Sequence, residues 1–246
     1  CSPGWIKFGE TFYPDLLEHV SSCKSPQQML GAVVKTWYAQ RQGLNPERMV
    51  NISVMPCTAK KFEARRPEMG RDGYRDVDIV LTTRELARMI RQAGIDFDLL
   101  RPQDPDELLA AYSGAATIFG STGGVMEAAL RSAYELRLGR PLKRLELGEV
   151  RGAEGVRTAE IDFDGTPVRV AVAHGLGNAR RLLDEVRAAK RRGELPYHFI
   201  EIMACPGGCV GGGGQPLEST MRRRRARADG LYAEDGSLPI RRSHEN

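Results

Sequence analysis

The sequence predicts an α/β protein in which largely parallel sheets are flanked by helices. Strand-like and helix-like segments alternate along most of the 246 residues, and 41% of the residues are hydrophobic, which is enough to bury a core. No apolar run approaches the roughly 18 residues that span a bilayer, so no membrane span is expected. A Gly-, Pro- and Arg-rich stretch at 137–150 predicts a hinge, which divides the chain into approximate lobes 1–139 and 140–246.

Five short apolar or β-branched segments are predicted to be strands, because each is bounded by Gly, Pro or polar turn residues. In chain order they are 49–56, 75–83, 114–121, 166–175 and 197–204. The pair Asp164 and Gly165 lies between two segments of alternating polarity and predicts a β-hairpin.

Four segments carry apolar residues at helical spacing, and several of them end at Gly. They are 25–42, 84–94, 123–139 and 178–193. Because these segments alternate with the predicted strands, we expect the helices to cover the faces of the sheets.

The charge pattern gives little support for a nucleic-acid partner. The chain has 36 Lys and Arg against 32 Asp and Glu, a net charge of +4, with the excess in the arginine-rich stretches 180–192 and 221–227. No aromatic residues interleave with these arginines, so we interpret them as solvated helix surface and expect no nucleic-acid binding.

The five cysteines indicate metal or redox chemistry, because they are too few for a disulfide scaffold and odd in number. Cys57 and Cys205 each follow a predicted strand, where open α/β sheets place their sites. In "CPGGC" the proline and two glycines permit a tight turn that points Cys205 and Cys209 at one centre. Zinc would also accept such thiolates, but it would not explain the glycines at 211–214, so iron and sulfide fit better.

Three segments resemble the signature segments of the [FeFe]-hydrogenase catalytic domain, in order and at suitable separations. They are "CSPGW" at 1–5, "MPCTAKKFE" at 55–63 and "FIEIMACPGGCVGGGGQP" at 199–216. The resemblance implies that 1–246 is an H-cluster catalytic domain, truncated at both ends, with the metal cluster between two α/β lobes. It also implies the reaction 2H⁺ + 2e⁻ ⇌ H₂. The H-cluster is a [4Fe-4S] cube joined through a cysteine sulfur to a diiron unit that carries CO, cyanide and a bridging azadithiolate.

The resemblance assigns roles to individual residues in the second and third segments. Cube ligands correspond to Cys57, Cys205 and Cys209, with Cys209 as the bridge to the diiron unit. The lysine that donates to a cyanide ligand corresponds to Lys60.

Further residues correspond to the surroundings of the cluster in the family. Glu63 and Ser21 correspond to the proton route. The wall that excludes water and tunes the potential corresponds to Met55, Phe119 and Met203.

The beginning of the chain departs from the commonest family pattern, which has two adjacent cysteines before "PGW". Without a gap, Cys1 keeps the proton-relay position and Ser2 takes the position of the fourth cube ligand, where a harder donor changes the potential. Alternatively, Cys1 is the fourth ligand and Ser2 or water relays the proton. Cys23 is a third candidate ligand, and its interpretation as a buried small residue is equally acceptable.

The resemblance implies several partners besides H₂ and protons. These are electron-transfer iron–sulfur domains or subunits, linked to ferredoxin or NAD(P)H, and maturation proteins that install the diiron unit. A cytoplasmic location is preferred over a periplasmic one. Two other functions stay open: a hydrogenase-like iron–sulfur cluster assembly protein, which Cys1, Lys60 and Glu63 argue against, and an H₂-sensing relative.

Two further patterns are interpreted without a ligand. The loop at 120–128 resembles a phosphate-binding turn but lacks its Lys, so we expect it to face the cluster. The histidines have no ligand spacing and are expected to be ordinary surface or core residues; they are His19, His174, His198 and His244.

Overall fold

The computed structural model describes residues 1–106, 109, 111–142, 146–152 and 155–245. The chain forms two compact units: Cys1–Leu99 with Gly212–Leu217, and Leu100–Gly211 with Glu218–Asn246. The boundary between the units thus lies earlier in the chain than the expected boundary between lobes 1–139 and 140–246. In addition, the short glycine-rich segment Gly212–Leu217 belongs to the first unit. Part of the expected hinge, 143–145, lies outside the described residues.

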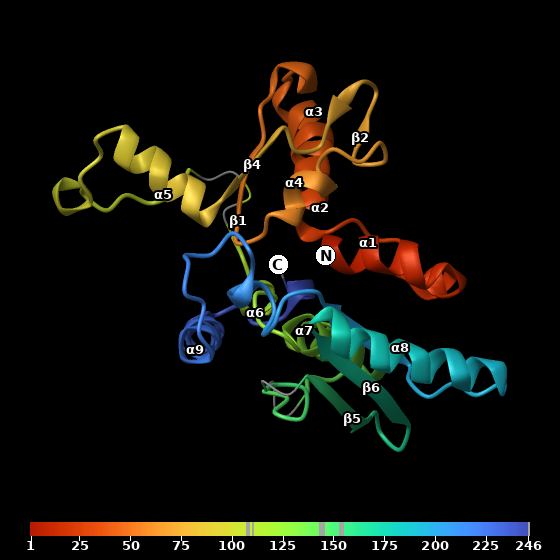
Figure 1. Ribbon diagram of the computed structural model, residues 1–246. Helices are drawn as coiled ribbons and strands as arrows, with labels where there is room; N and C mark the ends of the chain where they lie inside the picture. The colour runs from red at the N-terminus through yellow and green to blue at the C-terminus, as the bar shows by residue number, and fades with distance from the viewer. Residues whose placement is uncertain (107–108, 110, 143–145, 153–154, 246) are drawn as a thin grey trace. The chain divides into compact units, whose positions relative to one another are not determined.

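The first unit is mostly helical, with short strands between the helices (Figure 1). Its elements are α1 (Pro3–Phe12), η1 (Pro14–His19), α2 (Pro26–Val33), η2 (Val34–Tyr38), α3 (Ala39–Gln42), η3 (Pro46–Arg48), β1 (Ile52–Met55), α4 (Ala59–Glu63), β2 (Gly70–Arg71), β3 (Tyr74–Arg75), β4 (Ile79–Thr82), α5 (Thr83–Gln92) and η4 (Phe97–Leu99).

The second unit combines a three-stranded sheet with longer helices. Its elements are α6 (Gly114–Ile118), α7 (Gly124–Leu138), β5 (Val156–Asp162), β6 (Pro167–His174), α8 (Leu176–Arg191), β7 (Phe199–Met203), η5 (Cys209–Gly211), α9 (Met221–Ser237) and η6 (Ser243–Glu245). Among the described residues, no helix is both long and apolar enough to cross a bilayer.

In the first unit, β1 and β4 form a parallel pair, as expected for the predicted strands at 49–56 and 75–83. Behind them, Met55 packs on a small apolar cluster of Ala64, Val77 and Val80. Thr82 ends β4 and begins α5 with a capping box, in which its hydroxyl accepts the N–H of Glu85 and the Glu85 carboxylate accepts the N–H of Thr82. The carboxyl ends of β1 and β4 therefore lie at one edge, where Cys57 follows.

In the second unit, the predicted hairpin is confirmed. β5 and β6 pair antiparallel around a two-residue turn in which Asp164 and Gly165 have φ of 58° and 85°. β6 and β7 pair in parallel, with His174 opposite Met203, and α8 lies along β6 (Figure 1). The carboxyl ends of β6 and β7 are thus neighbours, and the chain enters the Cys205 turn from this edge.

The prediction of a strand at 114–121 is wrong, because this segment begins with helix α6. The Ser113 hydroxyl caps the helix by accepting the N–H of Ala116 at 3.3 Å, and Ala115 and Ile118 are buried. An apolar run this short does not distinguish a buried strand from a buried helix.

Buried charges join α7 to α9 in the second unit. The Arg131 guanidinium is fully buried, with Nη1 2.8 Å from Asp235 Oδ1 and Nη2 2.6 Å from Glu127 Oε1. Both carboxylates are also fully buried. Because each charge has partners at hydrogen-bond distance, the network fixes the two helices in one arrangement.

Candidate metal centre

Cys57 lies in the first unit between the end of β1 and the start of α4, under the returning glycine-rich segment. The N–H of Gly214 donates to the carbonyl of Pro56 at 2.9 Å, and a Cβ on Gly214 would lie 3.0 Å from the Cys57 nitrogen. Only glycine permits this approach, so part of the predicted glycine-rich stretch packs against the backbone at Cys57.

Cys205 and Cys209 lie in the second unit on one tight turn after β7. The N–H of Gly208 donates to the carbonyl of Cys205 at 3.1 Å, and Gly207 and Gly208 have φ of 81° and 90°. A Cβ on Gly208 would lie 2.6 Å from the Thr122 nitrogen, so the turn rests directly on the loop before α7. The predicted two-cysteine turn is therefore present, with glycine where backbone contacts backbone.

The loop before α7 holds the cysteine turn through its backbone. The N–H of Thr122 donates to the carbonyl of Gly207 at 3.0 Å, and the N–H of Val210 donates to the carbonyl of Gly120 at 3.0 Å. From the other side, Arg227 of α9 donates to the carbonyl of Val210 at 2.8 Å. These bonds restrain the backbone on both sides of Cys209.

Glu201 anchors the same loop, a role that was not predicted from the sequence. The Glu201 carboxylate is buried in β7 and accepts the N–H groups of Gly123 and Met126, each at 2.7 Å, at the start of α7. Burial raises the pKa of Glu201 to about 7, although these backbone donors act in the opposite direction. A charged residue within an otherwise apolar predicted strand was the signal that could have identified it.

His174 also contacts the cysteine turn, whereas the sequence predicted only an ordinary surface or core histidine. The residue ends β6, is buried, and accepts the N–H of Gly207 on Nδ1 at 3.1 Å. Its position at the end of a predicted strand was the available signal.

Lys60 and Glu63 form a buried ion pair on α4. Lys60 Nζ lies 3.0 Å from Glu63 Oε2 and 3.2 Å from Oε1. Two neutral side chains also donate to the Glu63 carboxylate: Ser25 Oγ donates to Oε2 at 2.7 Å, and Gln27 Nε2 donates to it at 3.3 Å.

Ser21, which was predicted to lie on the proton route, does not take part in this set. It is exposed, and its hydroxyl accepts the N–H of Cys23 at 3.3 Å. The hydroxyl that contacts Glu63 is thus that of Ser25, which was not predicted from the sequence.

The other predicted residues divide between the two units. In the first unit, Cys1 is exposed, and Ser2 is half-buried at the start of α1 without a side-chain capping bond. Cys23 is exposed rather than buried. In the second unit, Met203 is buried at the end of β7, and Phe119 is half-buried after α6.

The donor set fits an iron–sulfur cube by its chemistry. Among the described residues, none of the cysteines is in a disulfide, and no three Cys, His, Asp or Glu side chains surround a common metal position. Cys57 lies in the first unit, and Cys205 and Cys209 lie in the second. Thiolate donors suit iron and sulfide. The glycines beside them let backbone pack closely against backbone, which holds the cysteines in tight turns.

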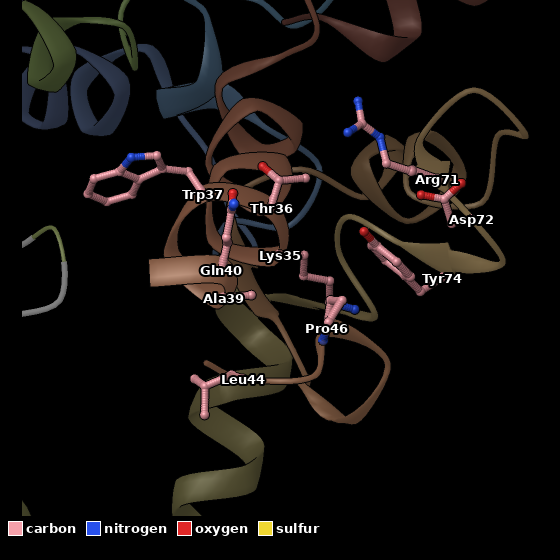
Figure 2. Close-up of a pocket in the computed structure, with 10 residues that line it drawn as sticks. All are labelled: Lys35, Thr36, Trp37, Ala39, Gln40, Leu44, Pro46, Arg71, Asp72 and Tyr74. Carbon is pink, nitrogen blue, oxygen red and sulfur yellow. The ribbon is translucent and has the colours of Figure 1, made fainter. Parts of the chain in front are cut away.

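An open cavity in the first unit does not belong to this centre. It has a volume of about 470 Å³, and its wall includes Lys35, Trp37, Arg71 and Tyr74 (Figure 2). Lys35 Nζ is paired with Asp78 at 2.7 Å and lies 5.8 Å from the centre of the Tyr74 ring. None of the predicted site residues lines the cavity.

Comparison with known proteins identifies the family. A family model described as iron only hydrogenase large subunit, C-terminal domain, matches residues 1–213. The chain is 51% identical to NADP-reducing hydrogenase subunit HndD of Solidesulfovibrio fructosivorans, over 100% of this chain and 41% of that protein. It is 52% identical to the periplasmic [Fe] hydrogenase large subunit of Nitratidesulfovibrio vulgaris, over 88% of this chain and 51% of that protein.

A solved structure and a more distant relative extend the comparison. A variant of [FeFe]-hydrogenase HydA1 from Chlamydomonas reinhardtii superposes with a TM-score of 0.82 at 43% identity, covering 100% of this chain and 68% of that one. Cytosolic iron-sulfur assembly component 3 of Mus musculus is 36% identical, over 87% of this chain and 45% of that protein. The chain thus spans about half the length of the curated relatives it matches or somewhat less. On the family model, these identities and the fold, the chain belongs to the iron-only, or [FeFe], hydrogenase large-subunit family, in its C-terminal domain.

Proposed function

We propose that the chain is the catalytic part of an [FeFe]-hydrogenase, which interconverts H₂ with two protons and two electrons at an H-cluster. The observation that carries the proposal is the turn after β7. It presents Cys205 and Cys209 on two glycines with positive φ, of which Gly208 has no space for a side chain. This turn occurs in a chain about half identical to named hydrogenases.

The proposed cube ligands are Cys57, Cys205 and Cys209, with Cys209 also bridging to the diiron unit. The fourth ligand is Ser2, with Cys1 as the alternative. When bound, the H-cluster supplies the redox chemistry, with a [4Fe-4S] cube to carry electrons and a diiron unit at which H₂ forms or splits. The glycine backbone beside the thiolates tunes the potential through the direction of its N–H groups.

Lys60 is proposed to bind a cyanide ligand through its ammonium group. An ammonium has three N–H donors, and the two contacts with Glu63 occupy at most two of them. Glu63 compensates the charge of Lys60 in a buried position, where an unpaired ammonium would be strongly destabilising. The pair thus keeps a charged donor available in a site that Met55, Phe119 and Met203 are proposed to keep dry.

The proposed proton route uses Cys1, Ser21 and Glu63. The support in the first unit is the hydrogen-bonded set around the Glu63 carboxylate, to which Ser25 adds a hydroxyl at 2.7 Å. A carboxylate with a hydroxyl donor at this distance can accept a proton and pass it on. Ser25 is therefore included in the route beside Ser21.

The proposed electron partners are iron–sulfur domains or subunits linked to ferredoxin or NAD(P)H. The similarity to a subunit named as NADP-reducing supports this class of partner. Maturation proteins are proposed to deliver the diiron unit. A cytoplasmic location is proposed, although the relatives include a periplasmic enzyme.

The test is H₂ evolution from a reduced viologen dye by the full chain, loaded anaerobically with a cube and then with a synthetic diiron precursor. The loaded wild-type chain and Cys23→Ala should evolve H₂, whereas Cys57→Ala should not. A wild-type chain that holds the cube and an intact diiron unit without turnover would overturn the catalytic role and favour cluster assembly. Loss of the cube in Cys23→Ala with retention in Cys57→Ala would overturn the ligand assignment.

A further inference from the structure

We propose that His174 is a positioning residue for the Cys205–Cys209 turn. By holding the N–H of Gly207, it sets the reduction potential of the cube. The inference rests on the proposed function, because it has a consequence only where these two cysteines bind a cube. His174 ends β6, whereas both cysteines lie on the turn that follows β7. From the sequence, this histidine was expected to be an ordinary surface or core residue.

The backbone of His174 is fixed on both sides, so its ring has a defined direction. Its N–H donates to the carbonyl of Gly155 at 3.1 Å, and its carbonyl accepts Nδ2 of Asn178 at 2.8 Å. In the sheet it lies opposite Met203, two residues before Cys205. From this position the buried imidazole accepts the Gly207 N–H on Nδ1 at 3.1 Å. Because Nδ1 is the acceptor in this bond, the neutral ring carries its proton on Nε2.

The peptide group of Gly207 depends on this bond, because glycine has no side chain that would restrain its backbone. Gly207 and the next residue, Gly208, both have positive φ, so the peptide groups between the two cysteines can rotate more easily than elsewhere. Two partners fix the polar groups of Gly207: Thr122 donates to its carbonyl, and His174 accepts its N–H. Removal of the imidazole would leave the N–H without this acceptor.

The direction of this N–H matters for an iron–sulfur cube. Backbone N–H groups that point at thiolate or sulfide sulfur stabilise the more negative, reduced cluster and raise its reduction potential. While His174 holds the Gly207 N–H, that donor is directed at the imidazole. When the acceptor is lost, the N–H can turn towards sulfur, and the potential should rise.

The chain offers a matched control in His198. Its Nδ1 also accepts a backbone N–H, that of Arg169 at 2.9 Å, at the opposite end of the β6–β7 pair. Replacement of His198 removes the same kind of bond from the same pair of strands, away from the cysteine turn. An effect that arises only from a weakened sheet would be common to both histidines.

The experiment measures the reduction potential of the cube by a redox titration followed by electron paramagnetic resonance, on the full chain reconstituted with the cube alone. His174→Leu should raise the potential, with about a tenfold higher ratio of reduced to oxidised cube at a fixed applied potential, equivalent to about 59 mV. His198→Leu should leave the potential unchanged.

Two polar variants keep the test informative if His174→Leu does not fold. In His174→Asn, the amide oxygen takes the place of Nδ1, so the wild-type potential should be restored. In His174→Gln, the oxygen lies further from the backbone, near the place of Nε2, so the potential should stay shifted. Equal potentials for all the His174 variants and the wild-type chain would overturn the inference. Failure of the wild-type chain to take up a cube would instead overturn the proposed function.

Discussion

Replacement of Gly208 by alanine tests whether the cysteine turn needs glycine where it meets the loop before α7. At a φ of 90° an alanine is strained by about 1–2 kcal/mol. Its Cβ would also lie 2.6 Å from the Thr122 nitrogen, and relief of that contact requires a backbone shift of about 1–3 kcal/mol. We therefore expect Gly208→Ala to lower the free energy of unfolding by about 2–5 kcal/mol.

Gly193 supplies the control for backbone strain alone. It has a φ of 72°, and a Cβ there would meet nothing within 4 Å. Gly193→Ala should therefore lower the free energy of unfolding only through backbone strain, by about 1–2 kcal/mol. The assay is urea unfolding of the full chain, with iron bound per chain measured after reconstitution. Equal stabilities for the two variants, with equal iron content, would refute the close-approach reasoning.

Three further predictions concern the buried charges. Lys60→Met leaves the Glu63 carboxylate without its cation and should lower the free energy of unfolding by about 3–5 kcal/mol. The double variant Lys60→Met with Glu63→Leu should recover the stability but not catalyse H₂ turnover. Turnover in the double variant would contradict the role of Lys60. Glu201 has a folded-state pKa of about 7 against an ordinary 4.5, so the folded chain keeps a proton that the unfolded chain loses. The free energy of unfolding should fall by about 3 kcal/mol as pH rises from about 4.5 to 7, and urea titrations of Glu201→Gln should lack this fall. Arg131→Met should lower the free energy of unfolding by about 3–5 kcal/mol in the same assay, whereas Arg192→Ala, at an exposed pair, should leave it nearly unchanged. Similar effects would contradict the importance of burial.

The hairpin was predictable from the sequence because its signal is local. Asp164 and Gly165 adopt the positive φ that such a turn requires, whatever surrounds them. Helix α6 was not predictable in the same way. The identity of the 114–121 segment depends on burial against α9 and on the Ser113 cap, and hydrophobicity alone does not separate these alternatives.

The positions of Cys57, Cys205 and Cys209 were predictable, because strand ends and glycine turns can be recognised in the sequence. Their role as cube ligands stays a proposal. The supporting residues were not predictable, because their role depends on tertiary contacts. His174 and Glu201 reach the cysteine turn and its loop from separate strands, and Ser25 rather than Ser21 donates to Glu63. The division of the chain at Leu99–Leu100 likewise follows from packing, since α6 and α7 associate with α9 and β7.

Infrared spectroscopy tests the central claim, an H-cluster in this chain, most directly. The full chain is reconstituted with a cube, supplied with a synthetic diiron precursor, and freed of unbound complex before the spectrum is recorded. The account predicts CO and cyanide bands that differ from those of the precursor and are lost in Cys209→Ala, which removes the proposed bridging ligand. A wild-type chain that carries the cube but shows no protein-bound CO or cyanide bands would contradict the account.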